Sequence, residues 1–369
     1  MSSIRILIIR LSSMGDVILQ TSLVELLKEQ HGDKVEVTFL TSKEFESLLT
    51  GHPHINQVLT FDRKMQKTKA LIEIVNSEHK KKNFDLIIDL HNTLRSTIIR
   101  WRFFYIPSLA VDKRRLERIL ITKFKINLLK PFHGKAQVQL ERILFDFSGI
   151  LHLNYHRHRL SSYIDREVNY ANPDEAPISS TAYSYTKKDV IYNPEQKWQK
   201  KQYICLLPSS AHANKRWPEE HFISFTKIFL NSSEGKNKKV LILAGKEDTF
   251  CRAFDVLEKE FPDRVYNLQG KCNLLESSLL TRDALFCVGN DTGLVHVAES
   301  FSTPSVVLFG PTTEDFGFYP HLKNSKTISL QMWCRPCSTT GKNKCFRKER
   351  YCMTHITPQA VMDEVKELC

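Results

Sequence analysis

Short runs of aliphatic and β-branched residues alternate along the chain with longer segments of helical period. The run IRILIIRL at 4–11 is followed by leucines at i, i+4, i+7 and i+8 from Leu19, which form one face of a helix ending near Gly32. The alternation continues with apolar runs at 35–40, 57–61 and 85–90, a helix-like stretch near 43–50 and a lysine-rich helix up to about residue 82. Strand and helix in strict turn are typical of a parallel α/β sheet.

The same rhythm restarts after a polar interval. Residues 167–202 are rich in Asn, Asp, Ser, Tyr and Lys and show no sustained period, so we interpret them as the crossing between two domains. Five more buried strands are predicted, at 203–208, 239–245, 265–270, 284–290 and 305–310. Pro218, followed by two glutamates, is typical of the first turn of a helix. The expected architecture is α/β, with two Rossmann-like domains whose ligands bind outside the carboxyl ends of the strands.

Composition changes this picture little. The chain has 369 residues, of which 41% are hydrophobic and 25% charged, and this length suggests two domains of roughly 150 residues or more. No apolar stretch approaches the ~20 residues that a membrane span needs, and the first residues lack a signal-peptide pattern, so we expect a cytoplasmic protein. Nine cysteines, mostly scattered singly, fit reduced thiols. A net charge of +12 predicts an anionic partner: nucleic acid, an acidic membrane or a phosphorylated substrate.

The turn RLSSMGDVILQT at 10–21 joins the first strand to the first helix. It has one glycine rather than the three of a dinucleotide-binding turn, and Asp16 would repel a phosphate at the helix start. One interpretation is that Ser12, Ser13 or Asp16 caps the helix. The other is that Asp16, held at the mouth of a cleft, acts as a general base towards a neutral hydroxyl.

The segment GNDTGLVHVAES at 289–300 follows a strand and begins a helix. Asp291, Thr292 and Gly293 would lie at the helix N-terminus, where free backbone N–H groups can bind an anion, with His296 on the first turn. The alternative is that Asp291 caps the helix and His296 is a surface residue.

Two further loops follow strand ends in the second half. PSSAHANKRWP at 208–218 offers two hydroxyls and Lys215, and AGKED at 244–248 offers Glu247. Hydroxyls, a lysine and a helix start suit a diphosphate, and a carboxylate suits ribose hydroxyls. Together the three loops predict a nucleotide site.

Four motifs carry a resemblance to a known family: RLSSMGDVILQT, KRWPEEHF, NDTGLVHVAESFSTPSVVLFGPT and CRPCSTTGKNKCFRKERYCMTHITP. With them the chain resembles the ADP-heptose:lipopolysaccharide heptosyltransferases of glycosyltransferase family 9, in particular those like heptosyltransferase II. The resemblance implies a GT-B fold of two facing Rossmann-like domains. It also implies an inverting transfer of heptose from ADP-heptose to the inner core of lipopolysaccharide, with no catalytic metal and no cofactor.

The resemblance also assigns roles to individual residues. Asp16 would deprotonate the acceptor hydroxyl. Lys215 would be a second catalytic residue, which contacts the nucleotide phosphate and ribose. The other donor-binding residues would be Ser209 and Ser210 beside Lys215, Glu247 at the ribose, Asp291 at the sugar, and Thr292, Gly293 and His296 around the diphosphate.

The stretch DLHNTLRS at 89–96 resembles the acceptor-side segment of the family. Arg95 and Ser96 would face acidic core sugars or lipid phosphates, although a helix start capped by Asn92 or Thr93 explains the stretch as well. Basic and large apolar residues mix from 95 to 125. Such runs are mostly amphipathic helices over a core, and the alternative is peripheral contact with anionic lipid at the cytoplasmic face of the inner membrane.

Near the C-terminus, four cysteines are spaced C-x2-C-x7-C-x6-C. Reduced thiols are the default interpretation and a structural zinc site is the alternative, for Cys334, Cys337, Cys345 and Cys352. The expected domains are an acceptor-binding domain at 1–188, a nucleotide-sugar domain at 189–355 and a last helix at 356–369 that packs back on the first domain.

Two other functions remain open at this stage. One is a GT-B transferase that uses another nucleotide sugar. The other is a basic protein that binds nucleic acid or a membrane surface, although no nucleic-acid-binding motif is present and nucleic acid is not the expected partner.

Overall fold

The computed structural model describes residues 3–63, 67–128, 198–320 and 322–368. Its contacts divide the chain into two compact units: Met1–Lys113 with Ala136–Ser179, and Arg114–Lys135 with Ser180–Cys369. The expected boundary at residue 188 and most of the crossing at 167–202 lie outside the described residues, so these two remain predictions.

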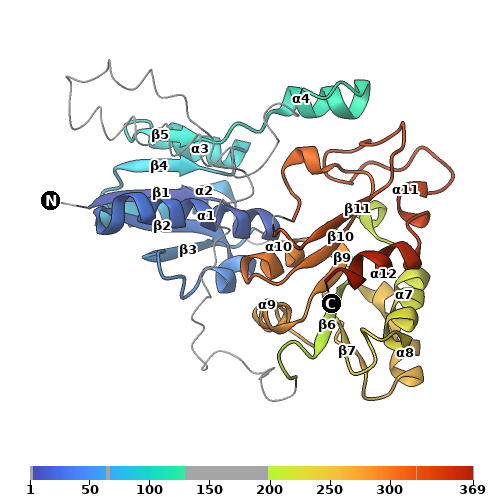
Figure 1. The fold of residues 1–369 in the computed structure, drawn as a ribbon. Coiled ribbons are helices and arrows are strands. Elements are labelled where there is room, and N and C mark those ends of the chain that lie inside the picture. The colour runs from blue at the N-terminus through green and yellow to red at the C-terminus, as the bar shows by residue number, and fades with distance from the viewer. Residues whose placement is uncertain (1–2, 64–66, 129–197, 321, 369) are drawn as a thin grey trace. The chain divides into compact units, whose positions relative to one another are not determined.

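The first unit contains a parallel five-stranded sheet in the order β3-β2-β1-β4-β5 (Figure 1). Its strands are β1 (Ile4–Ile9), β2 (Val35–Ser42), β3 (Gln57–Phe61), β4 (Leu86–Asp89) and β5 (Ser108–Ala110), and its helices are α1 (Met14–His31), α2 (Thr68–Lys82) and α3 (Leu94–Arg102). Ile6 and Ile8 pack in one core with α1, whereas Leu7 and Ile9 pack in another with α2 and α3. Burial on both faces explains why β1 is a continuous apolar run.

The second unit contains a parallel six-stranded sheet in the order β11-β10-β9-β6-β7-β8. Its strands are β6 (Tyr203–Leu207), β7 (Lys239–Ile242), β8 (Val265–Asn267), β9 (Cys287–Asn290), β10 (Ser305–Phe309) and β11 (Lys326–Ser329). The main helices are α7 (Glu219–Asn231), α8 (Asp255–Glu260), α9 (Leu274–Asp283), α10 (Gly293–Ser300), α11 (Tyr351–Thr354) and α12 (Pro358–Lys366). Nowhere in the described ranges does a helix have the length and apolarity of a membrane span.

The predicted strands are confirmed, with three differences. The stretch near 43–50 is a 3₁₀ segment, Lys43–Leu48, rather than an α-helix. Strands β5 and β11 were not predicted, because they are short edge strands that are only partly buried and lack a continuous apolar run.

The last helix, α12, packs within the second unit. Val361, Met362 and Val365 are buried in the same core as the aromatic face of α7. Its apolar stripe packs on α7 and β10, and the expectation that the helix also packs back on the first domain stays a prediction.

The segment after β5 also belongs to the second unit, although the sequence places it well inside the first domain. It contains α4 (Arg115–Ile119), and beyond this helix Lys125 Nζ donates hydrogen bonds to the carbonyls of Cys334 at 2.8 Å and Pro336 at 2.7 Å. Asn127 Nδ2 donates to Asp315 at 2.9 Å. Tertiary contacts, rather than position in the chain, therefore decide where this segment belongs.

In each sheet the strand order reverses at one point. In the first unit the chain runs outward from β1 to β2 and β3, and then to β4 and β5 on the other side of β1. In the second unit the same reversal separates β6 from β9. The loops after the two strands at such a switch point diverge and leave a crevice, which is where open α/β sheets bind ligands.

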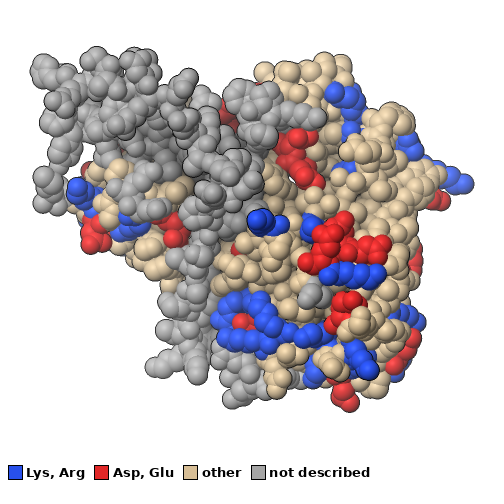
Figure 2. Space-filling view, in the orientation of Figure 1, with Lys and Arg blue, Asp and Glu red and all other residues tan. Residues whose placement is uncertain are grey.

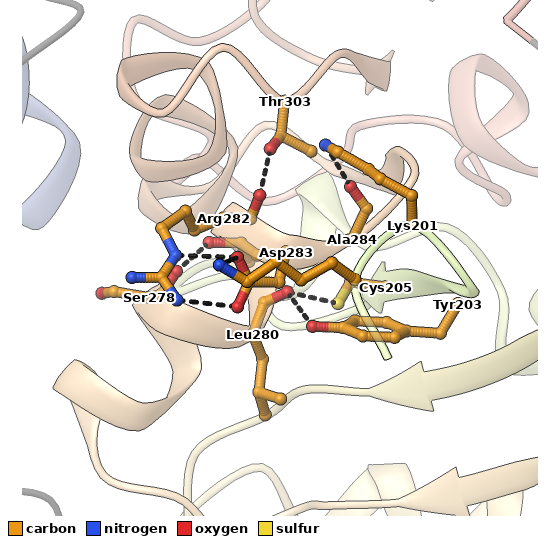
Figure 3. A network of polar contacts seen from close by, with 11 residues as sticks. Lys201, Tyr203, Cys205, Ser278, Leu280, Arg282, Asp283, Ala284 and Thr303 are labelled. Carbon is orange, nitrogen blue, oxygen red and sulfur yellow. Dashed lines mark hydrogen bonds and ion pairs between the residues drawn. The ribbon is translucent and has the colours of Figure 1, made fainter. Parts of the chain in front are cut away.

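A network of polar contacts holds the opposite, amino-terminal ends of β6 and β9 (Figure 3). It satisfies carbonyl groups at the end of α9, which have no partner within the helix. The Tyr203 hydroxyl donates to the Leu280 carbonyl at 2.9 Å, Lys201 Nζ donates to Ala284 at 2.7 Å, and the Thr303 hydroxyl donates to Arg282 at 2.9 Å. The network anchors α9 to the sheet at the end remote from the loops that carry the candidate chemistry.

We expect Tyr203→Phe to lower the free energy of unfolding by about 1 kcal/mol, because it removes a buried hydrogen bond to Leu280 without creating a large cavity. Urea denaturation would measure the change. Tyr266→Phe is the matched control, since its hydroxyl donates to the Asp263 carbonyl at the surface and its loss should cost less than about 0.5 kcal/mol. Equal losses in both variants would contradict the role of the network.

Candidate functional site

Asp16 lies in the first turn of α1, where the chain leaves β1. One carboxylate oxygen pairs with the Arg10 guanidinium at 2.6 Å. The other accepts hydrogen bonds from the Ser13 backbone N–H at 2.9 Å and from the Ser13 hydroxyl at 2.7 Å. The capping interpretation is confirmed in that Ser13 is the N-cap residue and Asp16 closes a capping box. The Asp16 side chain is still 15% exposed, so a cap and a base are compatible roles.

Two opposing effects set the charge of Asp16. Burial would raise its pKa, but the charge of Arg10 and the hydrogen bonds from Ser13 outweigh burial and hold the pKa below its usual value. Asp16 is therefore an ionised carboxylate at neutral pH, the form in which it can accept a proton.

Arg10 connects the two strands at the switch point of the first unit. The Arg10 side chain is 10% exposed, and its guanidinium donates to the Leu90 carbonyl at the end of β4 as well as pairing with Asp16. It therefore fixes Asp16 relative to the loop after β4. The sequence analysis missed this residue, because only the strand order shows that β1 and β4 are neighbours.

The loop after β4 is organised by a fully buried carboxylate. Asp89 accepts hydrogen bonds from the backbone N–H groups of His91 at 3.0 Å and Asn92 at 2.7 Å, and it pairs with Arg100 of α3 at 3.0 Å. Burial, followed by the charge of Arg10, lowers the pKa of His91 to about 4, so its imidazole is neutral at pH 7. Its buried Nδ1 has no hydrogen-bond partner among the described residues.

The two predicted acceptor-side residues differ in their surroundings. Ser96 is fully buried, and its hydroxyl bonds only the backbone of Thr93, which is the N-cap residue of α3. The structure thus uses Ser96 to start a helix, and a ligand-binding role for its hydroxyl does not fit. Arg95 is partly exposed, with its guanidinium 5.8 Å from the centre of the Phe61 ring.

In the second unit, Lys215 and Asp291 meet at the switch point. Lys215 Nζ lies 2.5 Å from an Asp291 carboxylate oxygen, and the two side chains are only 13% and 11% exposed. The same oxygen accepts a hydrogen bond from the Thr312 hydroxyl at 2.9 Å, in the loop after β10. Gly341, at φ +84°, lies against the stem of Lys215, where a Cβ would be 2.4 Å from Lys215 Cγ.

Asn290 holds the two loops at this switch point together. It is fully buried at the end of β9, and its amide donates to the Pro208 carbonyl at 2.7 Å and accepts from the Trp217 backbone N–H at 2.8 Å. The sequence analysis named the motif around Asn290 but gave this residue no role. Its role depends on a contact between loops that are far apart in the chain.

The helix that follows, α10, is capped by Thr292 rather than by Asp291. The capping alternative for Asp291 is therefore wrong, because its carboxylate is engaged by Lys215 and Thr312. His296 is 6% exposed, so the alternative of a surface histidine is also wrong. Gly293 begins the helix, and backbone N–H groups of a first turn have no intrahelical partner and favour anions.

The remaining predicted donor-side residues lie on the loops after β6 and β7. The Ser209 hydroxyl donates to Asp248 at 2.6 Å, and Asp248 also accepts from the Gly245 backbone N–H at 2.9 Å. The Ser210 carbonyl accepts two hydrogen bonds from Arg216 at 2.8 and 3.0 Å. These contacts shape the loops.

Glu247 is exposed beside Asp248 in the loop after β7. Asp248 was missed in the sequence, where nothing distinguishes it from Glu247.

The four C-terminal cysteines lie in the described part of the chain. All four are free thiols, and no group of three or more His, Cys, Asp or Glu side chains in the described ranges could hold a metal ion. Burial raises the pKa of Cys337, and that of Cys352 to about 11, so these thiols are protonated at neutral pH.

Comparison with known proteins gives this geometry a context. A model of glycosyltransferase family 9 (heptosyltransferase) matches residues 76–346, well over half of the chain. The chain is 22% identical over 368 residues to lipopolysaccharide heptosyltransferase 1 of Campylobacter coli, covering 99% of this chain and 98% of that protein.

Two solved structures from Escherichia coli are similar in fold. ADP-heptose LPS heptosyltransferase II has a TM-score of 0.66 at 19% identity, covering 99% of this chain and 98% of that one. Heptosyltransferase WaaC, solved with ADP-2-deoxy-2-fluoro heptose, has a TM-score of 0.64 at 19% identity, covering 99% and 100%. The GT-B fold predicted from the sequence is confirmed. Because the family model matches well over half of the chain, the chain belongs to glycosyltransferase family 9, the heptosyltransferases.

Proposed function

We propose that this protein transfers heptose from ADP-heptose to the inner core of lipopolysaccharide, with inversion and without a metal ion or other cofactor. The observation that carries the proposal is the Lys215–Asp291 pair, 2.5 Å apart at the start of α10. It combines a cation for a diphosphate with a carboxylate for sugar hydroxyls. The similar WaaC structure was solved with an ADP-sugar, which supports this choice of donor.

On the donor side, Lys215 and the first amides of α10 would bind the diphosphate, with Thr292, Gly293 and His296 around it. Asp291 would accept hydrogen bonds from the sugar, and the exposed Glu247 would accept them from the ribose. Ser209 and Ser210 would act by shaping the loop beside Lys215. This division of labour follows from charge, since a carboxylate repels phosphate and binds hydroxyl groups.

In the proposed reaction, the bond between the anomeric carbon and the diphosphate oxygen breaks as the acceptor hydroxyl attacks from the opposite face, which inverts the anomeric centre. Negative charge grows on the departing ADP, where Lys215 and the α10 N-terminus stabilise it. Asp16 takes the proton from the attacking hydroxyl. A carboxylate held at low pKa by Arg10 is a weak base, and it suffices because the hydroxyl becomes acidic as it bonds to carbon.

On the acceptor side, Arg95 would bind an acidic group of the core. The neutral His91 lies on the loop that Arg10 joins to Asp16, next to the proposed base. We place the reaction at the cytoplasmic face of the inner membrane, where a nucleotide sugar and a lipid-linked acceptor can meet.

The first test distinguishes the role of Asp16 as the base from the role of Lys215 in binding the donor. We expect Asp16→Asn to lower the transfer rate to heptose-deficient lipopolysaccharide about 10²- to 10⁴-fold while the Kd for ADP stays within about twofold. Lys215→Met should raise the Kd for ADP about tenfold or more, because a charged contact to phosphate is lost. Calorimetry and a transfer assay measure the two effects. Loss of ADP binding in Asp16→Asn would contradict the assignment.

The second test asks what Asp291 recognises. We expect Asp291→Asn to weaken ADP-heptose binding but to leave ADP binding unchanged or tighter, since it removes a negative charge near the diphosphate. Asp263→Asn, an exposed carboxylate on the same unit, is the control and should change neither. Calorimetry with ADP-heptose, ADP-glucose and ADP measures sugar preference. Equal affinity of the wild type for the two ADP-sugars would favour a transferase for another sugar.

The third test concerns pH. His91 has a pKa of about 4 in the folded protein and about 6.5 when unfolded. Between these values the unfolded chain binds the additional proton, so the free energy of unfolding should fall as the pH drops from 6.5 to 4. His91→Gln should reduce this slope, measured by urea denaturation at several pH values. Asp16 does not interfere, because its lowered pKa places its own loss of stability at lower pH. An unchanged slope would contradict a neutral, buried His91.

A further inference from the structure

The outer side of α3 carries large apolar side chains where a surface helix usually carries polar ones. Leu94, Trp101, Phe104 and Tyr105 are 75%, 72%, 83% and 55% exposed. Leu94, Ile98 and Trp101 follow one another at i, i+4 and i+7, so they lie on one face of the helix. Four exposed apolar residues within one short segment are an exposed patch, which marks an interaction surface.

The core does not need this face. Ile99, Phe103 and Ile106, on the other side of the segment, are at most 4% exposed and pack with α2 and the sheet. The segment is thus apolar on two sides, and only one side is covered by the described residues.

The charge on the α3 segment itself has one sign. The sequence has no Asp or Glu between Asp89 and Asp112, whereas this stretch contains Arg95, Arg100 and Arg102. Asp89 itself is fully buried and paired with Arg100. On the face drawn in Figure 2, Lys and Arg side chains lie beside Asp and Glu side chains, so the net charge alone does not single out a surface.

The end of α2 adds further cations beside the aromatic side chains. The His79 ring lies 5.8 Å from the Tyr105 ring, so the last turn of α2 adjoins the patch. The next residues, Lys80 and Lys81, are exposed. Lys81 Nζ lies 3.5 Å from a Glu78 carboxylate oxygen, so Lys80 is the better candidate of the two for an external anion.

We infer that this α3 surface, formed by Leu94, Trp101, Phe104, Tyr105, Arg102 and Lys80, rests on the anionic headgroups of a phospholipid membrane. Aromatic side chains with arginine and lysine around them suit a membrane interface, where rings enter the headgroup region and cations meet phosphates. A second copy of the chain fits less well, because a twofold interface would place these cations against one another. The inference rests on the proposed function in one respect: an enzyme with a lipid-linked acceptor has to work at a membrane surface.

The four tryptophans of the chain allow a direct test. Trp198 and Trp217 are 3% and 1% exposed, whereas Trp101 and Trp333 are 72% and 71% exposed, so Trp333 is a matched control in the second unit. With vesicles of phosphatidylglycerol and brominated phosphatidylcholine, we expect quenching of the wild-type fluorescence. Trp101→Phe should lose most of this quenching, and Trp333→Phe should retain it.

Binding strength gives a second measure. In vesicle sedimentation, Trp101→Ser with Phe104→Ser should weaken binding to phosphatidylglycerol about tenfold or more, and Arg102→Gln about fivefold. Trp333→Ser should bind as the wild type does. Pure phosphatidylcholine, or high salt, should weaken wild-type binding as well. Circular dichroism would check that the variants fold, as expected for changes on the exposed side.

Two results would overturn the inference. One is a wild-type protein that does not bind anionic vesicles, or that loses as much binding through Trp333→Ser as through Trp101→Ser with Phe104→Ser. The other is a dimer in solution that the α3 substitutions dissociate, which would assign the surface to a second copy. Transfer to a delipidated, water-soluble core acceptor tests the proposed function separately, since the α3 variants should retain that activity.

Discussion

Parallel strand pairing is the constraint on which both candidate sites depend. Because the strands of each sheet run the same way, the loops after their carboxyl ends emerge at one edge, and the reversal of strand order opens a crevice there. In the first unit that edge brings together Arg10, Asp16 and the loop after β4. In the second it brings together Lys215, Asp291 and the start of α10. An antiparallel arrangement would send alternate loops to opposite ends and separate these groups.

Each site also holds its main charge in a partly buried ion pair. A buried charge without a partner is costly, so Arg10 compensates Asp16, and Asp291 compensates Lys215. The pairing has opposite chemical consequences in the two units. Arg10 keeps Asp16 ionised, the form that can accept a proton, whereas Asp291 holds the ammonium of Lys215 in place. The proposed transfer uses both consequences, one on the acceptor and one on the leaving group.

The α3 segment connects the site to its surroundings. Arg100, near the end of α3, pairs with Asp89, which orders the loop after β4, while the outer face of α3 exposes Leu94 and Trp101. A helix that orders the acceptor-side loop and also contacts lipid would keep that loop near a membrane-bound acceptor. The same short segment would then serve both the ordering of the acceptor-side loop and the localisation of the protein.

The sequence by itself determined the repeating strand–helix order, the two parallel sheets and the loops that carry chemistry, because apolar runs and turn residues are local signals. It identified Asp16, Lys215 and Asp291 as candidates, and it left the roles of Asp16 and Asp291 divided between helix cap and active-site residue. Only the tertiary structure decided that Asp291 faces Lys215 while Thr292 caps α10, that Ser96 is buried, and that α12 packs on α7. It also supplied Arg10, His91, Asn290 and Asp248. These depend on strand order and on contacts between distant loops, which no local pattern encodes.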